Sequence, residues 1–80
     1  MLTTTTRITR RLHPDGFEAC VRDTNINVWG LVEWRRLGRS DAEIIESIPG
    51  LTAADLAAAW DYYAEHPSEI DAFIRRNEEA

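Results

Sequence analysis

Residues 40–66 read SDAEIIESIPGLTAADLAAAWDYYAEH, and this stretch decides the fold. It opens with SDAE, a capping box in which a serine and a glutamate three positions apart satisfy each other's backbone N–H groups. TAAD, from residue 52, repeats the signal with aspartate, and the Pro-Gly pair at 49–50 stops the first helix. The stretch therefore predicts helices over 41–48 and 53–66 joined by a tight turn, which is the pattern of a helix-turn-helix.

A further helix is predicted on each side of this pair. Upstream, Asn25 or Asn27 can cap a helix over 28–37 that the following glycine closes. Downstream, Pro67 breaks the third helix and Ser68 begins a fourth. The spacing of the apolar residues predicts one small core. Its members are Val28, Leu31, Val32, Leu37, Ile44, Ile45, Ile48, Leu51, Leu56, Trp60 and Tyr63.

The N-terminal part of the chain carries a hairpin signal. HPDG at 13–16 is typical of a turn, because proline presets φ and glycine accepts a positive φ. Apolar and polar residues alternate on both sides of it, over 7–12 and 17–22, as they do in short strands. The predicted fold class is thus mainly α: a short N-terminal β-hairpin followed by a three- to four-helix helix-turn-helix bundle.

Length and composition predict a single globular domain in the cytoplasm. Eighty residues fit one domain, and 44% apolar residues are enough for a core. No apolar run approaches the roughly 20 residues that span a membrane, and a lone Cys20 is typical of a reducing compartment. We expect residues 1–6 to be a disordered N-terminus, 7–66 the hairpin plus helix-turn-helix core, and 67–80 a C-terminal helix that frays from residue 75.

The charges are unevenly divided along the sequence. Residues 1–39 hold seven arginines and four acids, a net of +3, whereas residues 40–80 hold two arginines and ten acids, a net of −8. All nine basic residues are arginine, so each can make planar bidentate contacts with carboxylate or phosphate. The asymmetry indicates two different partners, or one partner and a charged, solvated surface.

Four blocks of the sequence resemble a known family. They are RDTNINVW at 22–29, LGRSDAEII at 37–45, IPGLTAADL at 48–56 and AAWDYYA at 58–64. In order and spacing they are similar to the motifs of the antitoxin-type domain of unknown function 433. The resemblance implies a homeodomain-like helix-turn-helix behind a short hairpin. It also implies an antitoxin that binds and neutralises a PIN-like nuclease toxin.

The chain departs from the family pattern in the loop before the first helix. Asp23, Asn25 and Asn27 stand where the family has glycine, arginine and proline, and Phe17 stands where glycine is common. Loss of that arginine removes a candidate contact to phosphate or to a partner.

The hairpin arginines are the candidate DNA-binding residues. A helix-turn-helix reads DNA with the start of its second helix, but here that start is TAAD, without a cation. The cations that remain are Arg7, Arg10, Arg11 and Arg22, and arginine–phosphate contacts dominate affinity for nucleic acid. The alternative is an edge strand whose charges protect it from aggregation.

The fourth helix supplies the candidate partner-binding residues. Ile70, Phe73 and Ile74 form a narrow apolar stripe with Arg75 and Arg76 beside it, the pattern of a helix that docks in a groove. By analogy with other antitoxins, an arginine there can pair with the acidic metal site of the nuclease. The alternative is that the stripe completes the chain's own core.

The sequence gives no support for catalysis, a metal site or a cofactor. It contains no CxxC, HExxH or glycine-rich phosphate loop, and its one cysteine and two histidines are far apart. We therefore predict a non-enzymatic protein whose partners are a PIN-like toxin and, as a second candidate, operator DNA. It would act as a homo-dimer or in a hetero-oligomer. The alternative function is a protein-interaction adaptor of the same fold that does not bind DNA.

Overall fold

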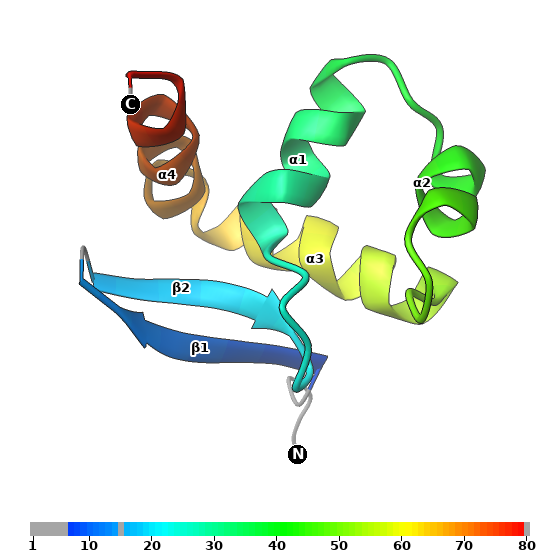
Figure 1. Ribbon diagram of the computed structural model, residues 1–80, viewed down its shortest axis with the longest axis horizontal. Coiled ribbons are helices and arrows are strands. Elements are labelled where there is room, and N and C mark those ends of the chain that lie inside the picture. The colour runs from blue at the N-terminus through cyan, green and yellow to red at the C-terminus, as the bar shows by residue number, and fades with distance from the viewer. Residues whose placement is uncertain (1–6, 15, 80) are drawn as a thin grey trace.

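The computed structural model describes residues 7–14 and 16–79 and has the predicted fold class. The expected disorder of residues 1–6, the turn residue Asp15 and the last residue lie outside the described residues. A hairpin is followed by four helices, as Figure 1 shows. The elements are β1 (Ile8–His13), β2 (Gly16–Val21), α1 (Val28–Arg36), α2 (Asp41–Ser47), α3 (Ala53–Glu65) and α4 (Pro67–Glu79).

The predicted caps begin the first three helices. Asn27, rather than Asn25, caps α1, and its side chain accepts a hydrogen bond from the backbone of Gly30 at 3.0 Å. Both halves of the two capping boxes that begin α2 and α3 are formed. α2 and α3 are joined by the predicted turn, in which Gly50 has a φ of +86° that favours glycine. The helix-turn-helix was therefore correctly read from local signals.

The two strands of the hairpin are antiparallel, and β2 lies between β1 and the loop that precedes α1. Ile8 pairs with Val21 and His13 with Gly16. The other edge of β2 is partly covered by the loop before α1, where Cys20 makes an isolated bridge to Asn27 and the Val21 N–H donates to the Ile26 carbonyl at 2.8 Å. This coverage buries Cys20 as well as its neighbours, so both faces of the end of β2 are buried.

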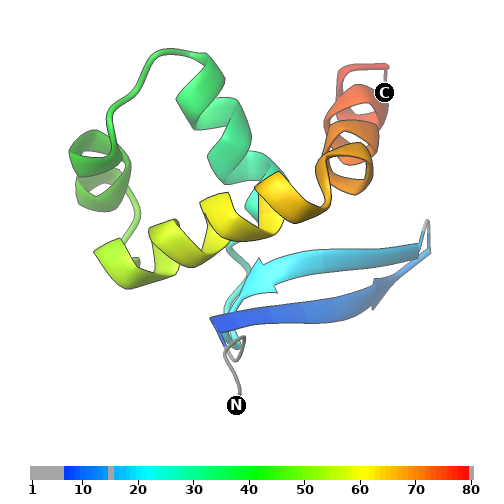
Figure 2. The same ribbon diagram turned by 180° about the vertical axis from the view of Figure 1, so that it is seen from behind.

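α1 lies at the centre of the bundle. It packs against α3 and α4, and α3 crosses the molecule from the α2 side to the α4 side, over the hairpin (Figure 2). The core is built from β2 and all four helices. Its buried members are Ala19, Val21, Val28, Leu31, Val32, Ile44, Leu51, Leu56, Ala59, Ile70 and Ile74.

Three expectations about the core and helix ends were wrong. Leu37, predicted as a core residue, is 77% exposed, because α1 ends at Arg36 and the next turn carries Leu37 out of the bundle. Ile45, Ile48, Trp60 and Tyr63 are only partly buried and pack against the core. The end of α4 does not fray within the described residues but remains helical to Glu79. No helix of the described part is long and apolar enough to cross a membrane.

Candidate functional site

A buried carboxylate forms ion pairs with two of the four candidate DNA-binding arginines. Asp55, in the first turn of α3, is fully buried, with an exposed fraction of 0%. Arg22 donates to it through Nε at 3.0 Å and Nη2 at 2.8 Å, and Arg7 through Nη1 at 3.0 Å. The Thr52 N–H adds a fourth hydrogen bond at 3.1 Å. These donors, with Arg22 first, outweigh burial and hold the pKa of Asp55 well below its usual range.

Arg22 ties the hairpin to the helix-turn-helix. It is a non-glycine residue with a positive φ of 49°. Its Nη2 also donates to the Gly50 carbonyl at 2.9 Å, in the turn between α2 and α3. The ion pairs with Asp55 raise the Arg22 pKa further above its ordinary value. We call Arg7, Arg22 and Asp55 the Asp55 clamp. Its hydrogen bonds give both arginines a structural role, because they join the hairpin to α3.

The other two hairpin arginines also turn toward their own chain. Arg10 lies with Nη2 3.6 Å from Glu69 Oε1 and with its guanidinium 5.1 Å from the Phe17 ring centroid. Arg11 donates through Nη1 to Asn25 Oδ1 at 2.7 Å. Reasoning from the sequence missed these contacts, because the hydrogen-bond and ion-pair partners lie 14 or more residues away and the periodicity of a strand does not predict them.

The position that reads DNA in a helix-turn-helix presents no positive charge here. The first exposed side chains of α3 are Ala53 and Ala54, and the acid that follows them is the buried Asp55. Asp61 and Glu65, farther along α3, are exposed acids that would repel phosphate.

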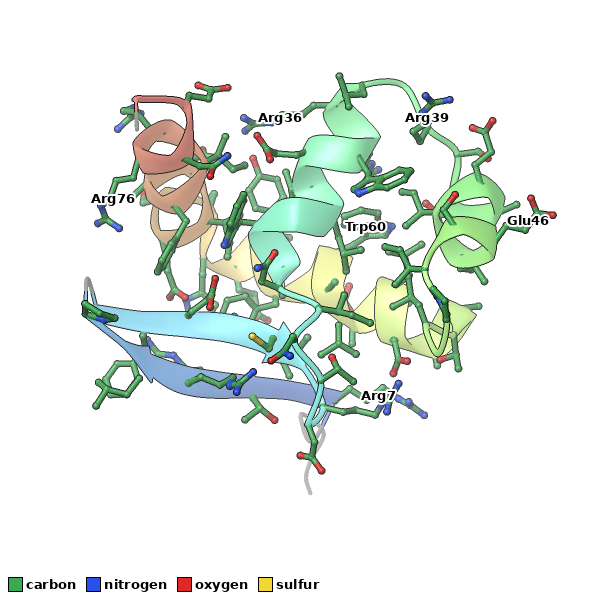
Figure 3. All side chains as sticks on the ribbon, in the orientation of Figure 1. Arg7, Arg36, Arg39, Glu46, Trp60 and Arg76 are labelled. Carbon is green, nitrogen blue, oxygen red and sulfur yellow. The ribbon has the colours of Figure 1, made fainter. Side chains whose placement is uncertain are left out.

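The apolar stripe of α4 is covered by the chain itself. Ile70 and Ile74 belong to the core, and Phe73 is 9% exposed. These three side chains are therefore inaccessible to a partner while α4 is docked, which corrects the picture of an open docking stripe. The arginines that follow them are exposed, and Arg76 lies over the Phe73 ring at 5.2 Å (Figure 3).

An exposed leucine lies at the opposite end of the molecule from the Asp55 clamp. Leu37 borders a shallow cleft of about 200 Å³ between α1 and α4, which is also lined by Arg36, Ile74 and two acids, Glu33 and Glu78. Arg36 and Arg39 lie at this end, as Figure 3 shows. Arg36 donates to Tyr63 at 3.0 Å and to Asp71 at 2.8 Å. We call Leu37, Arg36 and Arg39 the Leu37 surface; Arg75 and Arg76 are exposed on α4, and Arg76 lies on the side of α4 away from α1 (Figure 3).

A larger cleft, of about 440 Å³, separates β1 from α3. It is lined by Ile8, Arg10, Ala58, Asp61, Tyr62, Glu65 and His66. Burial first, and then a 2.8 Å hydrogen bond to Glu69, raises the pKa of Tyr62 to about 12. Burial likewise raises the pKa of the Cys20 thiol, so this sulfur has little thiolate character. In the described part of the chain, no three histidine, cysteine or acidic side chains gather to hold a metal ion.

The comparisons with known proteins concern this same fold. The profile of a family described as "Protein of unknown function (DUF433)" matches residues 16–63. A crystal structure of a DUF433 member protein from Anabaena variabilis ATCC 29413 is similar, with 43% identity and a TM-score of 0.80. The match covers 88% of this chain and 69% of that one. No curated protein matches the sequence.

Proposed function

The chain belongs to the DUF433 family of proteins of unknown function, and on this premise we propose that it is an antitoxin that binds and neutralises a PIN-like nuclease in the cytoplasm. The observation that supports the proposal is the Leu37 surface. Leu37, an apolar side chain that is 77% exposed, lies there near Arg36 at the end of α1 and Arg39 in the loop after it (Figure 3). Arginine is enriched at protein–protein interfaces relative to the rest of the surface.

The chemistry of this surface fits an acidic partner. A PIN-like nuclease holds its metal with a cluster of carboxylates, and arginine binds carboxylates in planar, bidentate pairs. Arg39 and Arg75 have no hydrogen bond or ion pair among the described residues, and Arg76 has only its ring contact. Arg75 and Arg76 therefore remain candidate partner residues. Leu37 replaces the buried stripe of α4 as the apolar anchor.

DNA binding is a weaker part of the proposal. Repression of the chain's own operon would need cations on the DNA-facing surface, and the four hairpin arginines are hydrogen-bonded or ion-paired within the chain. An adaptor of the same fold that binds a protein other than a nuclease is the alternative function. It would use the same surface, so only the identity and activity of the partner distinguish the two.

The test is co-purification with a PIN-like nuclease, followed by a ribonuclease assay. The wild-type chain should form a complex and abolish cleavage. Leu37→Glu should weaken the complex at least tenfold, or about 1.4 kcal/mol, because it places a carboxylate against an acidic site. Ala57→Glu is the control, since Ala57 is also exposed but lies on α3.

Two outcomes would contradict the proposal. Full nuclease activity in the presence of a stable complex would indicate an adaptor. Equal loss of binding in both variants, or in Ala57→Glu alone, would move the nuclease contact away from the Leu37 surface.

A further inference from the structure

The outer edge of β1 is an open sheet edge within the described structure. The sheet has two strands, and β1 pairs only with β2. The Arg22 N–H donates to the Arg7 carbonyl at 2.8 Å, so these two residues form a hydrogen-bonded pair. Hydrogen-bonded and non-bonded pairs alternate along an antiparallel ladder. The backbone groups of Thr9 and Arg11 therefore point toward β2, and those of Ile8, Arg10 and Leu12 point outward.

The charges that usually protect such an edge are turned away from it. Edge strands often carry exposed charges that prevent pairing with another chain. Here the Arg10 guanidinium lies over Phe17 and beside Glu69, and Arg11 is bonded to Asn25. Thr9, Arg10 and Arg11 are also exposed, and Leu12, at 81%, is the exposed apolar side chain of the strand.

We propose that β1 pairs with β1 of a second copy of this chain, in an antiparallel arrangement with the two-fold axis at Arg10. The order of strands in the joined sheet is β2, β1, β1, β2. Only this register uses all three outward residues, because Ile8 then exchanges hydrogen bonds with Leu12 of the second copy, and Arg10 with its own counterpart.

The same register covers the exposed leucine. Ile8 and Leu12 share one face of β1, since they are four positions apart. Leu12 of the second copy thus lies beside Ile8, at the mouth of the 440 Å³ cleft between β1 and α3. Leu12 of each copy covers the mouth of the cleft in the other copy, so the contact is self-complementary.

Charge also favours a second copy over an acidic partner at this edge. Asp61 and Glu65, both exposed, line the cleft beside Ile8. The strand added there carries arginines, so it brings positive charge next to two carboxylates. The two Arg10 side chains meet at the axis, and Glu69, 3.6 Å from Arg10 in each copy, offsets their repulsion.

Sedimentation velocity over a concentration series tests the proposal. The wild-type chain should dimerise, and Leu12→Glu should raise the dissociation constant at least tenfold, about 1.4 kcal/mol. Leu37→Glu, at an equally exposed leucine far from β1, should leave it unchanged. Because Leu12 makes few contacts within the chain, its variant remains folded. A monomeric wild-type chain, or a dimer that Leu37→Glu and not Leu12→Glu disrupts, would overturn the proposal.

Cross-linking tests the register separately. In a Cys20→Ala background, Arg10→Cys should form an inter-chain disulfide, because hydrogen-bonded pairs bring Cα atoms to roughly 5.5 Å. Thr9→Cys, one residue away and on the opposite face, should not. The background is needed because Thr9 pairs with Cys20 in the hairpin. Cross-linking of Thr9→Cys alone would show that the register is wrong.

Discussion

Asp55 is a charge that the fold places entirely out of water. A buried carboxylate is costly unless hydrogen bonds and opposite charges satisfy it. Asp55 has two arginines and the Thr52 N–H on its oxygens, while its own backbone N–H is capped by the threonine hydroxyl at 3.1 Å. The residue therefore completes a capping box and anchors the hairpin at once.

Asp55→Asn should destabilise the chain by about 2–4 kcal/mol, because it removes the charge that balances two arginines and weakens the helix cap. The estimate lies below that for a fully buried pair, since Arg7 and Arg22 are partly exposed and can be rehydrated. Urea unfolding measures the change. Glu46→Gln, at an exposed acid of α2, is the control and should stay within about 0.5 kcal/mol. An equally small effect at Asp55 would mean that the clamp contributes nothing.

The stability of the chain should fall in acid, partly through this residue. Because the folded pKa of Asp55 lies below its unfolded value, the ionised form stabilises the fold above the unfolded pKa of about 3.9. That contribution is lost as the pH falls below this value toward the folded pKa. Urea midpoints measured between pH 7 and pH 3 should therefore fall less steeply in Asp55→Asn than in the wild-type chain. Parallel curves would contradict the pKa shift.

At the scale of elements, α4 is a structural helix. Its proline occupies the first helical position, where no N–H is needed, and the turn before it directs Ile70 and Ile74 into the core beside α1. Ile70→Ala should cost about 2–5 kcal/mol, as other large-to-small core changes do. Asn77→Ala, on the exposed side of α4, should cost little. Thermal melts of both variants provide the measurement.

Removing α4 altogether should abolish cooperative unfolding. The sequence assigns residues 7–66 to the core and 67–80 to a separate C-terminal helix, but truncation after His66 would expose the apolar surface that α4 covers on α1. Circular dichroism melting tests this expectation. A truncated chain that still melts cooperatively would return α4 to the role of a detachable partner segment.

α3 is built to pack rather than to read DNA. We expect no sequence-specific complex with duplex DNA at about 0.15 M salt in a mobility-shift assay, because its first turn has no cation. Any binding at low salt should weaken across all sequences when Arg10 and Arg11 are changed to alanine. A sequence-specific complex that Ala53→Glu removes would show that α3 enters the groove.

At the scale of the whole molecule, the two oppositely charged halves of the sequence bind each other. Arg7 and Arg22 pair with Asp55, Arg10 with Glu69, and Arg36 with Asp71. Each of these ion pairs joins the basic first half to the acidic second half. These pairs engage four of the seven arginines of the first half but only three of the ten acids of the second half.

Self-association would add to the stability of so small a core. If β1 joins two copies, the melting temperature should rise with protein concentration, since binding to the folded state shifts the unfolding equilibrium. Leu12→Glu should melt at a temperature independent of concentration. Differential scanning calorimetry at several concentrations makes the comparison, and a flat wild-type series would contradict the dimer.

The sequence by itself determined the elements and their order. The capping boxes at 40–43 and 52–55, the Pro-Gly stop and the hairpin turn each act over three or four neighbouring residues, so the local chain contains all the information they need. The family motifs could be recognised for the same reason.

Only the tertiary structure decided what the side chains do. Arg22 and Arg7 meet Asp55 across 33 and 48 positions of sequence, and the α4 stripe is covered by helices that no periodicity connects to it. The sequence around an arginine does not show whether its side chain will bind a phosphate, a partner protein or a buried carboxylate. Its partner is fixed only when packing brings distant elements together, because burial and charge pairing depend on distance in space rather than along the chain.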